Sequence, residues 1–283
     1  MKRIYFYAFS AAFVLLSIVN GKAQVQVHVG VTTAVNATFV LDKGLSEDPR
    51  YNSKMTYNTA PIGFNFGVDF TNKFGLSLES IQSFQGQVYD IINVANEVKG
   101  QRKIELTYIQ LPLLLRFMSG GNGGARANFN IGPQLSFLTQ GVESVQTDQG
   151  IYKMPEGLNI ESIQQDFPTA TQNQEQLANG TYEIPANMPT NDILTKKADQ
   201  FKNTEFQIAA AFGLDIDIAK HLYLTTQIRA NYSLTDMRNG DVIDAIKSGN
   251  ASDLFGQRAN LLVGVQLGLH YTFGVTRSFK FKN

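Results

Sequence analysis

Hydrophobic residues alternate with polar or small residues along eight segments of the chain. In the first segment Val25, Val27, Val29 and Val31 occupy every second position. Side chains alternate between the two faces of a β-strand, so each segment predicts a strand with one apolar face and one small or polar face. The predicted strands cover residues 25–32, 62–71, 74–84, 106–117, 127–137, 206–217, 222–232 and 260–273.

The connections between these segments alternate in length. After the second, fourth and sixth segments the chain has short turns, at residues 71–73, 119–124 and 219–221. After the others it has long connections, at residues 41–58, 90–103, 141–203 and 238–257. Short turns at one end and long loops at the other are typical of transmembrane β-barrels, whose short turns face the periplasm. We therefore predict an all-β fold, a closed antiparallel up-and-down transmembrane barrel of about eight strands with long extracellular loops.

A soluble barrel with its apolar faces inward is the alternative. Two features favour the membrane barrel. The polar faces are rich in Gly, Asn and Gln rather than Lys and Glu, which suits a packed interior better than a surface in water. Aromatic residues also gather beside the short turns, as in the girdle of an outer-membrane barrel. These residues are Phe70, Phe74, Phe117, Tyr271 and Phe273.

Residues 1–23 have the pattern of a secretory signal peptide. Lys2 and Arg3 precede an apolar run, and Gly21 and Ala23 supply the small residues of a cleavage site. The mature barrel domain then covers residues 24–283. An uncleaved anchor is the alternative, although the apolar run is short for a membrane span. The predicted location is the bacterial cell outer membrane.

Three further segments carry a resemblance to a known family. Residues 108–117 read YIQLPLLLRF, Gly132-Pro133 lies in the next predicted strand, and residues 229–237 read RANYSLTDM. Together they resemble the PorT-like outer-membrane β-barrel family of Bacteroidetes-type envelopes, over essentially the whole mature chain. The resemblance implies a small barrel, and the member that names the family is required for type IX secretion. The long connection 141–203 departs from a minimal member and leaves that role open.

Proline within the first of these segments affects the predicted sheet. Pro112 has no backbone N–H to donate, so we expect a bulge or a local break in pairing there.

Six charged residues fall on the polar faces of the predicted strands. An eight-stranded barrel is wide enough only for its own side chains, and an isolated buried charge is costly. We therefore expect these residues to form a salt-bridge network that fills the lumen, with a proton or ion path as the alternative. They are Asp69, Glu79, Arg116, Asp215, Asp217 and Arg229.

Two histidines also fall on the polar faces. His28 and His270 lie near the short-turn ends of the first and last strands, which are neighbours in a closed barrel. The two rings are therefore expected to approach one another. Such a pair could bind a metal or respond to pH, or it could be two interior histidines with ordinary partners. No third ligand is evident, so no metal site is predicted.

Composition narrows the functional classes. The chain has no Cys, which excludes disulfide scaffolds and thiol enzymes. Its net charge of +0 gives no sign of the excess of basic residues typical of proteins that bind nucleic acid. A lipid-modifying outer-membrane enzyme is one alternative, but no serine–histidine–acid set can be assembled at one level of the barrel. We therefore predict a non-enzymatic protein with no catalytic residues and no cofactor.

The connection 141–203 is the most promising functional segment. It is rich in Gln, Asn and Thr, and it has nine acidic and four basic residues. Connections of this length are usually functional or disordered. We expect a monomeric barrel, in contact with outer-membrane lipid, that docks a partner protein through this segment in secretion or surface assembly. A stand-alone barrel with an adhesive or ligand-binding loop is the alternative.

Overall fold

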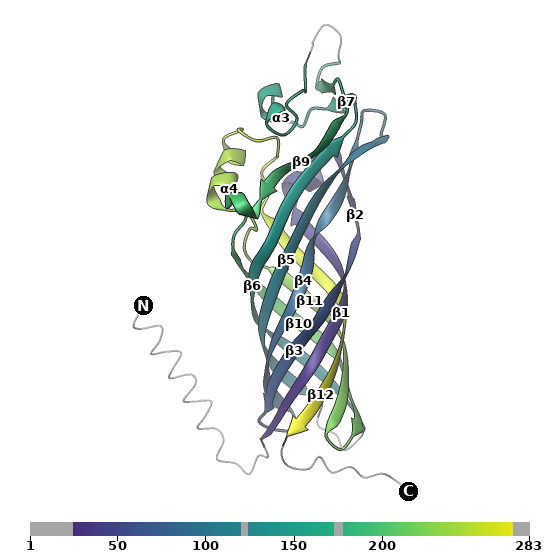
Figure 1. The fold of residues 1–283 in the computed structure, drawn as a ribbon, viewed down its shortest axis with the longest axis vertical. Helices are drawn as coiled ribbons and strands as arrows, with labels where there is room; N and C mark the ends of the chain where they lie inside the picture. Colours follow the sequence, from purple (N-terminus) through teal and green to yellow (C-terminus); the bar gives the residue numbers. More distant parts are fainter. Residues whose placement is uncertain (1–24, 120–123, 173–177, 274–283) are drawn as a thin grey trace, which may run out of the picture.

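The centre of the computed structural model is a ring of eight antiparallel strands (Figure 1). The structure describes residues 25–119, 124–172 and 178–273, so the predicted signal peptide lies outside the described residues. The predicted eight-stranded all-β barrel is confirmed. The strands of the ring are β1 (Gln26–Asp42), β3 (Thr56–Asp69), β4 (Phe74–Ile92), β5 (Val98–Met118), β6 (Ala125–Thr147), β10 (Thr204–Ala219), β11 (Leu222–Ser233) and β12 (Arg258–Phe273).

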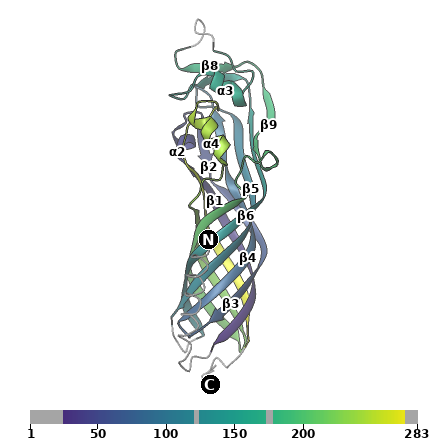
Figure 2. The ribbon, with the colours of Figure 1, turned by 90° about the vertical axis from the view of Figure 1, so that its left-hand side faces the viewer.

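The ring closes in up-and-down order. β1 pairs with β12 from Val27↔Phe273 to Asp42↔Arg258, which joins the two ends of the sheet. The predicted short turns are confirmed, since residues 70–73, 119–124 and 220–221 join successive strands. The turns at residues 70–73 and 220–221 lie at one end of the barrel with the neighbouring ends of β5 and β6, and the longer connections lie at the other end (Figures 1 and 2). We call these the short-turn end and the long-connection end. Residues 120–123 of the third predicted turn lie outside the described residues.

The outer face of the ring is apolar over a limited height. On β5, Ile109, Leu113, Leu115 and Phe117 are exposed and Leu111 is half-buried, while the even-numbered residues between them are buried. With a rise of about 3.3 Å per residue and a tilt of about 40°, residues 109–117 span about 20 Å, close to the height of a membrane-facing band. The exposed apolar residues of the other strands continue this band around the ring.

The predicted aromatic residues lie together at the short-turn end of the band. The ring centroid of Phe74 lies 5.9 Å from that of Phe70 and 5.6 Å from that of Phe117. The rings of Tyr271 and Phe273 lie 4.9 Å apart. Their positions match the predicted girdle.

Three strands run far beyond the apolar band, which corrects the predicted loops. The predicted connection 90–103 instead forms the ends of β4 and β5, joined only by residues 93–97. β6 continues to Thr147, inside the predicted loop 141–203. Outer positions of β5 above the band, such as Lys103 and Glu105, are polar because they face water. The apolar alternation on which the prediction depended is therefore lost there.

The inner positions of the same strands change in the opposite sense. Within the band, β5 turns Gln110 and Arg116 into the lumen. Above the band it turns Ile104, Leu106 and Tyr108 inward, into one large hydrophobic cluster. Within the band the lumen therefore contains polar and charged side chains, whereas in the upper body β5 contributes mainly apolar side chains beside the buried Arg102.

We call the part of the molecule beyond the band the upper body. In it β2 extends the sheet beside β4, β9 extends it beside β6, and β7 pairs with β8. Residues 148–172 and 178–187, which we call the cap, cover the top (Figure 2). The additional elements are α2 (Lys43–Glu47), β2 (Tyr51–Lys54), β7 (Gly150–Lys153), α3 (Ile160–Asp166), β8 (Thr181–Ile184), β9 (Met188–Thr195), η2 (Lys196–Ala198) and α4 (Gly240–Lys247).

A β-bulge lies where β6 enters the upper body. Tyr108 of β5 pairs with Leu138, but Thr107 pairs with Gln140, so Thr139 is an extra residue in β6. Because side chains alternate with a period of two, one extra residue exchanges the two faces of the strand. Even-numbered residues of β6 are therefore buried below the bulge, and odd-numbered residues are buried above it.

The predicted irregularity at Pro112 is a break in pairing and not a bulge. Pro112 pairs with Gln134 and Leu115 pairs with Ile131, but residues 113–114 between them are not paired with β6. The register is the same on both sides of the gap. The missing proline donor is therefore accommodated without a shift of the strands.

Candidate functional site

The lumen near the short-turn end contains a cluster of charged residues around Arg116. Its Nη2 donates to Asp215 Oδ2 at 2.9 Å, and its Nη1 lies 3.5 Å from Asp69 Oδ1. The hydroxyl of Tyr223 lies 3.3 Å from the same Nη1, which also contacts the ring of His28. β5, β10, β3, β11 and β1 supply these five side chains, so the cluster joins strands from both sides of the ring.

The two predicted interior histidines lie side by side in this cluster. The ring centroids of His28 and His270 are 5.6 Å apart. Tyr223 stacks on His270, with centroids 4.6 Å apart and an interplanar angle of 10°. Both histidines are buried, at 0% and 4% exposure. No group of three or more His, Cys, Asp or Glu side chains in the described part of the chain could hold a metal ion.

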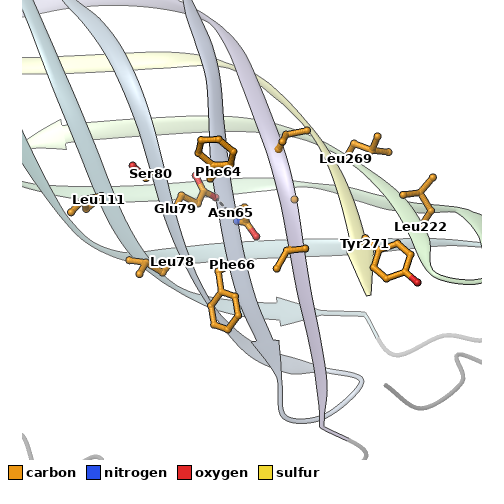
Figure 3. A pocket seen from close by; sticks show the side chains of 13 residues that line it. Phe64, Asn65, Phe66, Leu78, Glu79, Ser80, Leu111, Leu222, Leu269 and Tyr271 are labelled. Atoms are coloured by element: carbon orange, nitrogen blue, oxygen red, sulfur yellow. Dashed lines mark hydrogen bonds between the residues drawn. The ribbon is translucent and has the colours of Figure 1, made fainter. Parts of the chain in front are cut away.

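A second group of charges lies higher in the lumen. Arg229 Nη1 donates to Glu79 Oε2 at 2.5 Å and to Gln266 Oε1 at 3.0 Å, and its Nη2 donates to Gln134 Oε1 at 3.1 Å. Asn65 donates to the other oxygen of Glu79 at 3.2 Å (Figure 3). Such a buried pair lowers the free energy only when its remaining donors and acceptors are also satisfied, and here amides supply those partners.

The six charged residues expected in the lumen thus divide into groups. Asp69, Arg116 and Asp215 meet in the lower cluster, while Glu79 and Arg229 meet in the upper one. Asp217, the sixth, lies 3.8 Å from Arg126, which the sequence reasoning did not include. Arg126 is the second residue of β6 and lies directly after the predicted turn, where no alternation was yet visible.

The lumen is filled by these side chains. Two interior cavities have volumes of ≈ 20 Å³ and ≈ 10 Å³, enough for about one water molecule each. The first is lined by residues of both charge groups, among them Arg116 and Glu79. The described lumen therefore has the packed interior expected of an eight-stranded barrel.

The upper body contains a larger buried network around Arg102 and Arg258. Arg102 donates to Glu143 at 2.7 Å and, through two nitrogens, to Asp253 at 2.5 and 2.8 Å. Arg258 donates to Asp42 and Glu143, each at 2.6 Å, and to Asp253 at 3.0 Å. Both guanidinium groups are at most 1% exposed. The network ties the connection between α4 and β12 to the ends of β1, β5 and β6.

Two Asp-x-Arg motifs hold the same connection from either side. Arg50 donates to Asp48 at 2.6 Å and to the carbonyl of Ser252 at 2.5 Å. Arg238 donates to Asp236 at 2.9 Å and also to the carbonyl of Gly256. In each motif the backbone N–H of the arginine also donates to the side chain of the aspartate two residues earlier, at 2.9 Å. Each aspartate thus fixes its arginine against one carbonyl of the segment 250–257.

Burial and charge shift the pKa values of two carboxyl groups in the upper body. Burial raises the pKa of Asp166, and the nearby charge of Asp253 raises it further. Burial would also raise the pKa of Asp253, but Arg102 and Arg258 outweigh it and hold that pKa well below its usual range. Asp166 lies at the end of α3 and accepts a hydrogen bond from the hydroxyl of Ser252, which links the cap to the network.

Sequence reasoning missed the upper-body network. Its residues fall in segments predicted to be loops, or directly after one in the case of Arg258, where no strand face could be assigned. The one available signal was the repeated Asp-x-Arg, at Asp48-Pro49-Arg50 and Asp236-Met237-Arg238.

Residues 22–239 match the model of a family described as "Outer membrane protein beta-barrel domain". No curated protein matches the chain. No helix among the described residues is long and apolar enough to cross a membrane.

Solved structures of outer-membrane barrels resemble the fold. The outer membrane protein OprG from Pseudomonas aeruginosa has 14% identity and a TM-score of 0.38, with 91% of this chain and 99% of that chain covered. The attachment invasion locus protein Ail of Yersinia pestis has 10% identity and a TM-score of 0.35, with 87% and 98% covered. The outer membrane protease OmpT from Escherichia coli has 9% identity and a TM-score of 0.40, with 88% and 97% covered.

Proposed function

The chain belongs to the outer membrane protein beta-barrel domain family, and on that premise we propose that it is a non-enzymatic barrel that docks a partner protein through its cap. The barrel lies in the bacterial outer membrane, with its apolar band in the lipid. Since short turns of such barrels face the periplasm, the upper body faces outward.

The ordered upper body is the observation that carries the proposal. A barrel that needed only to close its strands would end them near the edge of the apolar band. Here a separate hydrophobic core extends above the band, and the cap adds the fully buried Tyr152, Ile163 and Ile184 to it. The rings of Tyr152 and Tyr182 stack at 5.7 Å. Such a body presents a fixed surface to a partner.

The charge of the cap indicates the kind of surface that it would meet. Between residues 148 and 187 the sequence has six acidic residues and one basic residue. Glu156 and Glu161 are exposed on it. Opposite charges across an interface increase the rate and the specificity of association, so the proposed partner presents a basic surface.

The positions of the histidines support the proposal that the protein is not an enzyme. The chain has three histidines. Two are buried in the lumen beside Arg116 and Tyr223, and His221 lies in the short turn between β10 and β11. None of them lies in the cap.

The resemblance to the PorT-like family supports a place in secretion or surface assembly, which is part of the same proposal.

Purification from the native outer membrane in mild detergent, followed by mass spectrometry of co-purifying proteins, tests the proposal. Thr147 and Met188 are paired, so residues 149–186 can be replaced by a short turn that preserves β6 and β9. We expect a stoichiometric partner with the intact protein and none with this deletion. If both the intact protein and the deletion variant were recovered without a partner, docking would be contradicted and a stand-alone adhesive barrel would be favoured.

A charge-reversal variant tests the same proposal without the deletion, which could misfold. Glu156→Lys with Glu161→Lys changes exposed residues of the cap, and Glu105→Lys changes an exposed residue of β5 below it. The double variant should lose the partner, and the control should keep it. Equal recovery from both variants would show that the acidic surface does not bind.

A further inference from the structure

The turn that leads into β8 lies at the surface of the cap. Ala178, Asn179 and Gly180 are all exposed. The backbone N–H of Thr181 donates to the carbonyl of Ala178 at 3.2 Å, which closes the turn. Gly180 has a φ of 78°, a left-handed value that favours glycine. β8 lies near the outer end of the molecule in Figure 2, so this turn lies in water and away from the apolar band.

Few contacts restrict this turn. A Cβ on Gly180 would meet nothing within 4 Å, so the space beside the turn is open. Among the described residues, no group forms a hydrogen bond with the side chain of Asn179. Gly180 is joined to the neighbouring segment by a hydrogen bond from the N–H of Met154 to its carbonyl, at 2.8 Å. The Asn179 side chain can therefore change its rotamer without breaking a hydrogen bond.

The pair Asn179-Gly180 is chemically reactive because glycine has no side chain to shield its backbone nitrogen. That nitrogen attacks the side-chain carbonyl carbon of Asn179 and forms a succinimide ring. The side-chain nitrogen of Asn179 leaves as ammonia, which carries the proton of the Gly180 N–H. One water molecule then opens the ring at either carbonyl group. The products are aspartate and isoaspartate, so the reaction consumes water and needs no oxidant.

A second Asn-Gly pair within the described residues is held much more firmly. Asn239 is the N-cap of α4, and its Oδ1 accepts a hydrogen bond from the N–H of Val242 at 3.0 Å. Its Nδ2 donates to the carbonyl of Asp199. Both ends of the Asn239 amide are thus bound, and Gly240 is fixed as the first residue of the helix. Reaction at Asn239 must first break two hydrogen bonds, which slows it at least about tenfold.

We propose that Asn179 is a modification site, at which loss of ammonia gives the cap a further negative charge as the protein ages on the cell surface. The new carboxylate lies in an acidic part of the cap. Gly180 is bonded to Met154, and the exposed Glu156 follows two residues later. The modified cap therefore presents a more negative surface than the newly made one.

The modification also reaches the strand that follows. Isoaspartate adds one carbon to the backbone at position 179, two residues before Thr181, which pairs with Lys153 at the start of β8. A longer backbone at this point loosens the end of the β7–β8 pair. The site thus couples a change of charge to a change in the outermost hairpin of the cap.

The consequence for docking rests on the proposed function, whereas the modification itself depends only on the turn. An additional carboxylate increases the rate of association with a basic surface. A barrel without a partner would still undergo the reaction at Asn179.

Peptide mapping by mass spectrometry tests the modification. The protein in bilayer nanodiscs is incubated at mildly alkaline pH, which speeds the attack because the Gly180 nitrogen must lose its proton. We expect aspartate and isoaspartate to accumulate at position 179 at least about tenfold faster than at position 239. Equal rates at the two positions, or an unchanged amide at Asn179, would overturn the proposal.

Two variants show whether the turn carries the reaction. Gly180→Ala places a methyl group beside the attacking nitrogen. Asn179→Gln changes the size of the ring that must form and leaves Gly180 in its left-handed conformation. Residue 179 should remain an amide in both variants over the same incubation. Formation of the acid in either variant at the rate of the unaltered protein would overturn the proposal.

A third variant, Asn179→Asp, supplies the charge without the reaction. In co-purification it should recover more of the partner than Asn179→Gln does, because the partner's surface is basic in the proposed function. Equal recovery from these two variants would overturn the consequence for docking, whereas peptide mapping decides the modification.

Discussion

Replacing Arg258 by Met removes the residue that contacts three carboxylates of the upper body. Asp42 and Glu143 each accept a hydrogen bond from its guanidinium group at 2.6 Å, and Asp253 accepts one at 3.0 Å. The guanidinium group is 0% exposed, so water cannot take its place without opening the structure. Removal of one partner from a buried ion pair typically costs about 3–5 kcal/mol, because the remaining charge stays buried.

The expected magnitude translates into an opening equilibrium. A cost of about 3–5 kcal/mol increases local opening of the upper body by about a hundredfold to a few thousandfold. Native-state hydrogen exchange in bilayer nanodiscs measures this opening at residues 142–147 and 250–257. Amides of β11 within the band should keep their protection, since Arg258 lies outside the band. The expected effect is thus confined to one end of the molecule.

Two further variants make the reasoning refutable. Lys43→Met removes the exposed ion pair with Glu47, whose side chains are 76% and 61% exposed, and should change stability by less than about 0.5 kcal/mol. Adding Glu143→Gln to Arg258→Met removes one of the carboxylates that has lost its partner and should recover part of the loss. If Arg258→Met behaved like Lys43→Met, the buried network would not hold the upper body together.

Two other predictions concern the cap and the lumen. Because the pKa of Asp166 is raised, its favourable contribution to cap docking is lost as pH rises above the usual aspartate value. The pKa of Asp253 is lowered, so the contribution of Asp253 is lost only as pH falls below the usual aspartate value. Hydrogen exchange of α3 should therefore be slower at about pH 5 than at about pH 7, after correction for intrinsic rates, and Asp166→Asn should abolish this difference. A Cβ on Gly67 would lie 2.1 Å from His28 Nε2, so Gly67→Ala should destabilise the barrel by about 1–3 kcal/mol in urea unfolding followed by circular dichroism. Gly124→Ala, where a Cβ would meet nothing within 4 Å, should leave the midpoint unchanged.

Sequence reasoning succeeded where one physical pattern extends over a whole strand. Within the apolar band, lipid outside and a packed lumen inside impose strict alternation, so the eight strands and their short turns could be predicted. The approach of His28 to His270 followed from closure of the ring. These expectations needed only the period of a strand and the order of the segments.

The upper body could not be predicted in the same way. Its strands exchange the environments of their two faces, so residues such as Lys103 and Ile104 no longer fit the pattern of the band. β6 also changes face at Thr139, which disrupts any alternation carried across it. Short elements such as β2 and β7 are fixed by contacts with distant segments. The partners of Arg102 come from positions 143 and 253, and no local pattern connects them.

The two cores of this protein allow its halves to vary separately. The bulge at Thr139 and the change of environment near Tyr108 mark the boundary between the upper body and the membrane-spanning barrel. The hydrophobic clusters on the two sides of this boundary share no residue. We therefore expect substitutions in the cap to leave the lipid-facing wall and the polar lumen unaffected. A different upper body could therefore be joined to the same membrane-spanning barrel at this level.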